Sequence, residues 1–143
     1  MDTFKERQER ENKRQYEKWL SCGFRGDMVI DKSGWCINGL SFYKNDNVEE
    51  QILFDRPRYI ARISFMQLPN GKWISGSSCT FPLQGWGHGL SVWDTQYDTK
   101  EEAVEKELDY IEKSLDEKDK KTFVLDAIRN CRTALRPLEI ALF

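Results

Sequence analysis

Charged and polar side chains dominate the first twenty residues, and the apolar positions gather toward the end of this segment. Between residues 2 and 20 there is no glycine or proline, and Thr3 is the only β-branched residue. Because Lys, Arg, Glu and Gln are good helix formers, this composition predicts a charged helix over 2–20. We expect Tyr16, Trp19 and Leu20 to dock its last turn while the first turns stay in solvent. Six basic and five acidic side chains nearly cancel, which favours a solvated helix over a nucleic-acid-binding arm.

Short apolar runs separated by turn residues follow the helix and indicate strands. Two such runs flank Asp31–Gly34, a sequence that favours a hairpin turn. The clearest hairpin joins Tyr59–Leu68 to Lys72–Phe81 through Asn70-Gly71, a pair that accepts the left-handed conformations of tight turns. Side chains of each strand point alternately to two faces, and neither face is wholly polar. We therefore expect one face to meet helices and the other to be partly covered or to receive a partner.

Two helices are predicted in the last third of the chain. Thr99 and Glu102 have the spacing of a capping box, which marks a helix start. The apolar stripe that follows has helical spacing and contains Val104, Leu108, Ile111 and Leu115. A second stripe, out of register with the first, contains Val124, Ala127, Ile128, Cys131, Ala134 and Leu135. The charged run 116–121 separates the stripes and favours two helices over one long rod.

These elements predict an α+β fold: an antiparallel sheet of about four to five strands, flanked by an N-terminal helix and two C-terminal helices. We expect a single domain over 1–143, divided into the charged helix 2–20, a β-rich core 27–97, a helical pair 99–136 and an apolar tail 138–143. Leaving such a tail in water is costly, so it should dock on the domain or form a homodimer. The tail residues expected to be buried are Leu138, Ile140, Leu142 and Phe143.

Composition and charge describe a polar globular chain. Its 143 residues are 39% hydrophobic, 32% charged and 13% aromatic, which is too apolar and too aromatic for a disordered protein. A chain of this length buries roughly two thirds of its unfolded surface. The net charge of −2 counts against a protein that binds duplex DNA mainly by neutralising phosphates.

The cysteines and the hydropathy pattern narrow the cellular context and the chemistry. No apolar run approaches the roughly 20 residues that cross a bilayer, so we expect a cytoplasmic protein without a membrane partner. Cys22, Cys36, Cys79 and Cys131 form no Cys-x-x-Cys pair, and there is one histidine. We therefore expect reduced, buried thiols, no metal site and no cofactor.

The segment 74–93 is the most distinctive part of the sequence. It places the only histidine, His88, between glycines and close to aromatic side chains. Glycines at 85, 87 and 89 allow positive φ angles, so we expect an aromatic loop that exposes its backbone rather than a regular strand. Interface centres favour such aromatic residues. The expected partner-binding residues are Trp73, Phe81, Trp86, His88 and Trp93.

Catalysis is a further reading of the same segment. His88 is the only side chain with an ordinary pKa near neutrality, Cys79 is a candidate nucleophile and Asp94 a candidate orienting carboxylate. No lipase-type elbow, phosphate-binding loop or zinc-protease motif is present in the sequence. A structural or ligand-contacting His88 is therefore favoured, and we expect no enzymatic activity.

Binding of single-stranded DNA or RNA is the alternative function. Aromatic side chains such as Trp73 and Trp86 stack on unpaired bases, and nearby cations hold the phosphates. The candidate cations are Arg58, Arg62 and Lys72. Residues 57–97 contain only one acidic residue, Asp94, so this part of the sequence is locally positive. Most of these rings are nevertheless expected to be core residues.

A resemblance to a known group covers residues 61–115. It rests on Leu68–Gly76, Gly85–Gly89 and Thr99–Ala103, and the segment is similar to uncharacterised modules of phages and mobile genetic elements. Such modules sometimes accompany ParB-like or DNA-methyltransferase segments. The resemblance implies a genomic context and transfers no activity or site residue.

These observations together predict a non-enzymatic interaction protein of a phage or mobile element. We expect its hairpin and glycine-tryptophan segment to bind a protein partner in nucleic-acid machinery. An inhibitor of a host defence nuclease would be one such protein.

Overall fold

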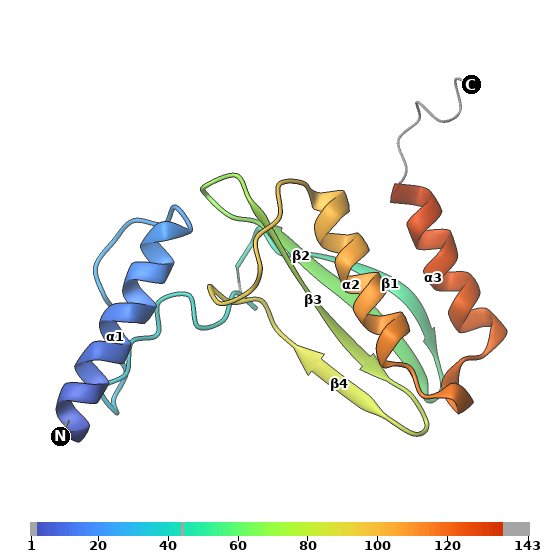
Figure 1. Ribbon diagram of the computed structural model, residues 1–143, viewed down its shortest axis with the longest axis horizontal. Coiled ribbons are helices and arrows are strands. Elements are labelled where there is room, and N and C mark those ends of the chain that lie inside the picture. The colour runs from blue at the N-terminus through green and yellow to red at the C-terminus, as the bar shows by residue number, and fades with distance from the viewer. Residues whose placement is uncertain (1–2, 44, 136–143) are drawn as a thin grey trace.

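A computed structural model describes residues 3–43 and 45–135 of the chain. The α+β arrangement is confirmed, with an N-terminal helix, a four-stranded antiparallel sheet and two C-terminal helices (Figure 1). The elements are α1 (Phe4–Ser21), β1 (Glu49–Arg56), β2 (Tyr59–Gln67), β3 (Trp73–Thr80), β4 (Gly85–His88), α2 (Lys100–Ser114), a short 3-10 helix η1 (Glu117–Asp119) and α3 (Thr122–Leu135).

The sheet is a simple meander in the order β1-β2-β3-β4. The hairpin between β2 and β3 turns at Asn70 and Gly71 as expected, and Gly71 adopts a φ of 91°. The pairing of β1 with β2 contains a register shift between Ile52 and Phe54. β1 and β4 are therefore the two edges of the sheet.

Helices α2 and α3 lie side by side over one face of the sheet (Figure 1). As the capping box predicts, the Thr99 hydroxyl accepts a hydrogen bond from the Glu102 amide at 3.1 Å. Both predicted stripes point toward the sheet except at Ala134, which is exposed, so each helix covers apolar strand residues. The buried cluster contains Phe54, Ala61, Ile63, Phe65, Cys79, Phe81, Val104, Leu108, Ile111, Leu115, Val124, Ile128 and Cys131.

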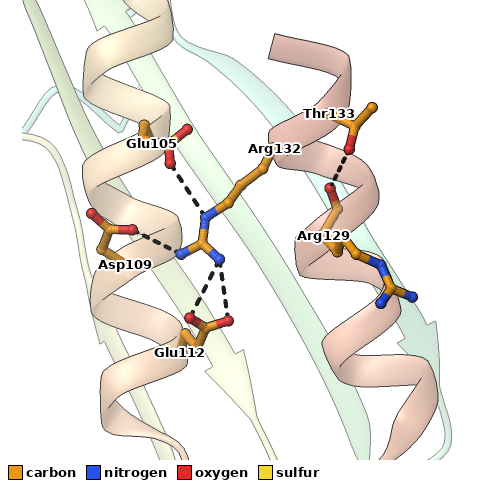
Figure 2. Close-up of polar contacts among 6 residues, drawn as sticks. All are labelled: Glu105, Asp109, Glu112, Arg129, Arg132 and Thr133. Atoms are coloured by element: carbon orange, nitrogen blue, oxygen red, sulfur yellow. Dashed lines mark hydrogen bonds and ion pairs between the residues drawn. The ribbon is translucent and has the colours of Figure 1, made fainter. Parts of the chain in front are cut away.

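An arginine joins the two helices above this cluster. Arg132 of α3 extends between three carboxylates of α2, while Arg129 points away from them (Figure 2). The guanidinium nitrogens lie 3.3 Å from Glu105, 2.7 Å from Asp109 and 3.1 Å from Glu112. Although burial opposes the charge on Arg132, the hydrogen bonds and charges of Glu112 and Asp109 hold its pKa above the usual value. The charges align the helices without adding to the apolar core.

A second apolar cluster lies on the other side of the sheet, toward the end of the molecule occupied by α1 (Figure 1). Met66 and Ile74 belong to it, because they alternate with the residues that face α2 and α3. The remaining members are Cys22, Phe42, Leu68, Leu90 and Val92, with Trp19, Phe24 and Val48 packed against them. The predicted docking of α1 by its last turns is thus observed through Trp19.

The N-terminal half of the expected β-rich core contains no strand in its described residues before Glu49. The turn at Asp31–Gly34 does form, and a single isolated bridge joins Ile30 to Cys36. The Asp31 amide donates to the Trp35 carbonyl at 2.8 Å, but the pairing extends no further as a ladder. The segment is short, and it packs on α1 rather than on a neighbouring strand.

The expected loop around His88 is a second correction. Residues 85–88 form strand β4, and none of Gly85, Gly87 and Gly89 has a positive φ. The alternation of glycine with Trp86 and His88 fits a strand with one bare face and one side-chain face. The apolar tail, with Leu138, Ile140, Leu142 and Phe143, lies outside the described residues.

The expectations of no membrane-spanning segment and of reduced, buried thiols bear on the residues that the structure describes. Within these residues, no helix has both the length and the apolar character needed to span a bilayer. All four cysteines are free and buried.

Candidate functional site

The residues predicted to bind a partner fall in three different places. Phe81 is 4% exposed and belongs to the core under α2 and α3. Trp73 and Trp86 are partly buried against the same core. His88 follows Trp86 on the face of β4 that meets α2, whereas Trp93 is 43% exposed and lies beside α1. The structure therefore divides the sequence segment 73–93 between a core, a polar pocket and an aromatic groove.

The polar pocket lies where β4 ends, between the edge of β3 and helix α2. Its volume is about 510 Å³. It is lined by Ser75, His88, Asp94, Thr95, Tyr97, Lys106, Glu107 and Tyr110. Several of its titratable groups have shifted pKa values, a property that functional pockets often share.

An imidazole-carboxylate pair occupies the inner wall of this polar pocket. His88 Nε2 lies 2.8 Å from Glu107 Oε1, and the two side chains are 41% and 8% exposed. The hydrogen bond from Glu107 raises the pKa of His88, although burial opposes the charge. Burial pushes the pKa of Glu107 upward, but hydrogen bonds from His88, Ser77 and Ser75 outweigh it and the pKa is lowered. The pair is thus an ion pair when His88 is protonated.

Hydrogen bonds and rings fix the position of this pair. Ser75 Oγ donates to the Ala103 carbonyl at 2.8 Å and lies 3.3 Å from Glu107 Oε2. The rings of His88 and Tyr110 meet edge to face, with 5.9 Å between their centroids. Gly76 allows β4 to approach, since a Cβ there would lie 2.6 Å from the His88 carbonyl oxygen. Residues of β3, β4 and α2 therefore all contribute to the position of the pair.

Two further groups of the polar pocket have shifted pKa values. Burial raises the pKa of Asp94, and the Ser91 amide, which donates to it at 2.8 Å, opposes that shift. Burial also raises the pKa of Tyr97, and the charge of Glu107 adds to the effect. The carboxylates thus make part of the pocket wall negative, while Lys106, and His88 when protonated, supply positive charge.

For the catalytic hypothesis, this geometry offers His88 as a candidate base but no reactive thiol. His88 lies 2.8 Å from the Glu107 carboxylate, which can orient the imidazole as the third group of a nucleophile–base arrangement does. Cys79 is only 2% exposed, and burial raises its pKa to about 12. Since the thiolate is the nucleophile, such a thiol is unreactive near neutrality. The negative charge of Asp94 adds a smaller upward contribution to the pKa of His88.

The aromatic groove lies between α1 and the segment 31–40, and Trp93 closes one side. Its volume is about 540 Å³. The groove is lined by Glu11, Asn12, Arg14, Gln15, Asp31, Trp35, Cys36, Leu40 and Trp93. Trp35, Leu40 and Trp93 are 37%, 57% and 43% exposed, so the groove presents apolar surface to solvent. Phe4 extends this surface, because its ring meets Trp35 edge to face at 5.9 Å.

Buried amide side chains hold the groove in shape. Gln15 donates to the Asn38 carbonyl at 2.7 Å and accepts from the Trp93 indole at 2.6 Å. Asn12 donates to the Gly34 carbonyl at 2.8 Å and accepts from the Cys36 amide at 2.8 Å. Asn12 and Gln15 are three apart and therefore lie on the same side of α1. The indole of Trp93 and the segment carrying Trp35 are thus anchored, and both rings remain partly exposed although the Arg14 guanidinium lies 4.8 Å from the centroid of the Trp93 ring.

The three cations of the nucleic-acid reading do not gather around the tryptophans. Arg58 and Lys72 lie in the turns at opposite ends of β2. Arg62 alternates with the residues that face the helices and so lies on the face opposite Trp73 and Trp86. Lys72 forms an ion pair with Asp98. The three cations are therefore spread over both ends and the far face of the sheet.

Neither metal-ligand clusters nor similarity to known proteins assigns a function to these sites. Within the described residues, no group of three or more His, Cys, Asp or Glu side chains could hold a metal ion. The chain matches no known protein family, no curated protein and no solved structure.

Sequence reasoning missed several residues of both sites. Glu107 lies three residues after Val104, inside the apolar stripe of α2, and a carboxylate at such a position signals a buried partner. Asn12 and Gln15 give a weaker signal, since amides are common on solvated helices. Trp35 and Leu40 give none beyond their apolar character, because exposure depends on packing.

Proposed function

We propose that this protein is a non-enzymatic interaction protein that binds a protein partner through the aromatic groove. The observation that carries the proposal is the exposure of Trp35 and Trp93 on a groove whose shape is fixed by Asn12 and Gln15. Interface hot spots are rich in tryptophan, and pre-ordered side chains lose little entropy on binding.

The distribution of exposed apolar residues supports this choice of surface. The segment 4–43 and Trp93 together contain Phe4, Val29, Ile30, Trp35, Ile37, Leu40, Tyr43 and Trp93. The remaining exposed large apolar residues, Ile52, Leu83, Tyr110 and Leu125, are distributed over β1, the turn before β4, α2 and α3. Among described residues, large exposed side chains are therefore concentrated near α1, and such concentrations mark interaction sites.

The partner class rests on the sequence resemblance alone. The similarity of residues 61–115 to phage and mobile-element modules suggests a partner in nucleic-acid machinery, such as a host defence nuclease that the protein would inhibit. A cytoplasmic location follows from the same proposal.

Affinity capture with matched tryptophan variants tests the proposal. We expect Trp35→Ala and Trp93→Ala each to lose the captured partner, because each removes a large apolar face from the groove. Tyr110→Ala removes an exposed aromatic side chain on α2 and should retain it. Retention of every partner by folded Trp35→Ala and Trp93→Ala proteins would refute the groove as the binding site.

Binding of single-stranded nucleic acid is the second proposal, and the separation of its cations weakens it. It requires affinity that falls with salt and with loss of Trp73 or Trp86. Fluorescence polarisation with labelled oligonucleotides distinguishes the two, since the groove proposal predicts no change in polarisation at micromolar protein and low salt.

A further inference from the structure

The edge of β3 that faces β4 is interrupted at one position. Trp73 exchanges two backbone hydrogen bonds with Tyr97, both 2.8 Å long. Further along the same edge, Ser77 is paired with His88. Between them, Ser75 has no residue of the described chain in register opposite it on this side.

The backbone groups of Ser75 point into this gap. In antiparallel pairing, a residue that exchanges both bonds with one neighbour is followed two positions later by another with the same orientation. Trp73 directs its N–H and C=O toward Tyr97, so Ser75 directs its own toward the same edge. An extended residue presents these two groups side by side, as a donor next to an acceptor.

The residues that follow β4 form their backbone hydrogen bonds with the N-terminal region and do not fill the gap. The Leu90 carbonyl accepts from the Phe42 amide at 2.8 Å, and the Val92 amide donates to the Gly39 carbonyl at 2.9 Å. These bonds draw residues 90–92 toward the N-terminal region. The gap therefore opens into the polar pocket, where Ser75 is flanked by His88 and Tyr97.

We propose that the polar pocket binds a primary carboxamide, independently of the partner proposed for the aromatic groove. The carboxamide oxygen accepts from the Ser75 N–H, and its amino group donates to the Ser75 C=O. An added strand is too long for this gap, because His88 and Tyr97 already occupy the positions on either side. A carboxamide carries both functions on one carbon and needs only the space of a single residue.

The hydrogen-bonding groups of the gap favour this neutral group over its acid. Asp94 and Glu107 bring negative charge to the pocket while Lys106 and protonated His88 bring positive charge, so net charge does not separate the amide from the acid. A carboxylate lacks the N–H that the Ser75 carbonyl requires, and a carboxamide supplies it. The rings of Tyr97 and Tyr110 offer apolar surface to whatever carries the amide. The carrier is either a small aromatic amide or a glutamine side chain of another protein.

Nuclear magnetic resonance on the full-length protein tests the proposal with matched probes. Nicotinamide should cause saturable shifts of the Ser75 and Gly76 amides and of the single histidine ring. Nicotinate, which differs in replacing the amide with a carboxylate, should bind about tenfold more weakly or not at all. N-acetylglutamine methylamide identifies the carrier: saturable shifts favour a protein side chain, and binding of nicotinamide alone favours a small aromatic amide.

Blocking variants supply the control. Thr95→Trp fills the mouth of the pocket from an exposed position and should abolish the nicotinamide shifts, whereas Thr80→Trp on exposed β3 surface should leave them unchanged. The wild-type comparison of nicotinamide with nicotinate remains decisive if Thr95→Trp does not fold. Equal binding of the two probes, no saturable shift with either amide, or unchanged shifts in folded Thr95→Trp would overturn the proposal.

Discussion

The two apolar clusters of this protein are held together in different ways. The cluster under α2 and α3 is enclosed by helices and by the strand ladders of the sheet, so its backbone groups are paired mainly within secondary structure, with the β3 edge at Ser75 as an exception. The cluster near α1 is enclosed largely by residues without regular structure, such as Phe42, Leu90 and Val92. There the amides of Asn12, Gln15 and Asn38 bond the backbone instead.

This difference has a consequence for function. A region held by individual side-chain bonds opens more easily than one held by a ladder, and binding surfaces are often drawn from such regions. The helix–sheet region then serves as the scaffold, and the region around α1 presents the aromatic groove. The comparison predicts global effects for substitutions in the first region and local effects in the second.

The largest expected effect comes from the scaffold core. Leu108 is fully buried between α2 and the sheet, so Leu108→Ala should lower the free energy of unfolding by about 3 kcal/mol through lost apolar contact and a cavity. Chemical denaturation measures this change. If hydrogen exchange of this variant accelerated only in residues near α1, the assignment of the scaffold to the helix–sheet region would be contradicted.

Gln15→Ala probes the region near α1. It removes the bonds to Asn38 and Trp93 and should cost about 2 kcal/mol locally, because a buried carbonyl loses its donor. Hydrogen exchange should then accelerate in residues 28–43, while amides of β2 and β3 keep their protection. Glu17→Ala, on an exposed part of the same helix, is the matched control and should change neither.

Arg132→Ala should have a smaller effect. Its three partners are each about half exposed, so the loss is expected to be about 1 kcal/mol despite the number of contacts (Figure 2). Arg129→Ala removes a more exposed arginine from the same helix and should cost less. Thermal unfolding compares the two, and an equal cost would contradict a bridging role for Arg132.

The pH dependence of the polar pocket is the smallest effect. The pKa of His88 is raised above 6.5, so its contribution to stability is complete below that pH and is lost as pH rises through the folded-state pKa. The pKa of Glu107 is lowered below 4.5, so its contribution is present above that pH and is lost as pH falls through the folded-state value. The pair therefore stabilises most between these limits.

Titration of the single histidine ring by NMR measures this coupling directly. The wild-type midpoint should lie above 6.5, and Glu107→Gln should lower it, since the amide provides no charge. In that variant, burial still lowers the pKa of His88 and the charge of Asp94 still raises it. A midpoint that does not change would show that Glu107 does not set the pKa of His88.

The sequence was most informative where periodicity acts locally. The stripe beginning at Val104 and the Asn70-Gly71 turn predicted α2 and the central hairpin, because helix spacing and turn conformation are properties of neighbouring residues. The glycines around His88 were misleading, since their flexibility suggested a loop although every second residue carries a large side chain. Alternation was the better guide.

The candidate sites were less predictable than the fold. The pairing of His88 with Glu107 joins residues 19 apart, and the bond from Trp93 to Gln15 joins residues 78 apart. Neither can be derived from spacing, because both depend on how α1 and α2 pack on other elements. The accessibility of Trp35 and the burial of Phe81 have the same origin.

Site-specific photocrosslinking tests most directly whether the region near α1 is the binding surface. A photoreactive residue at Leu40 lies on the aromatic groove, and one at Leu83 lies in the turn before β4, with exposed fractions of 57% and 58% in the native protein. Since exposure is matched, a difference in crosslinking reports where the partner binds. We expect a discrete adduct with the captured partner through position 40 and none through position 83. An adduct through position 83 alone would contradict the assignment of the partner surface to the aromatic groove.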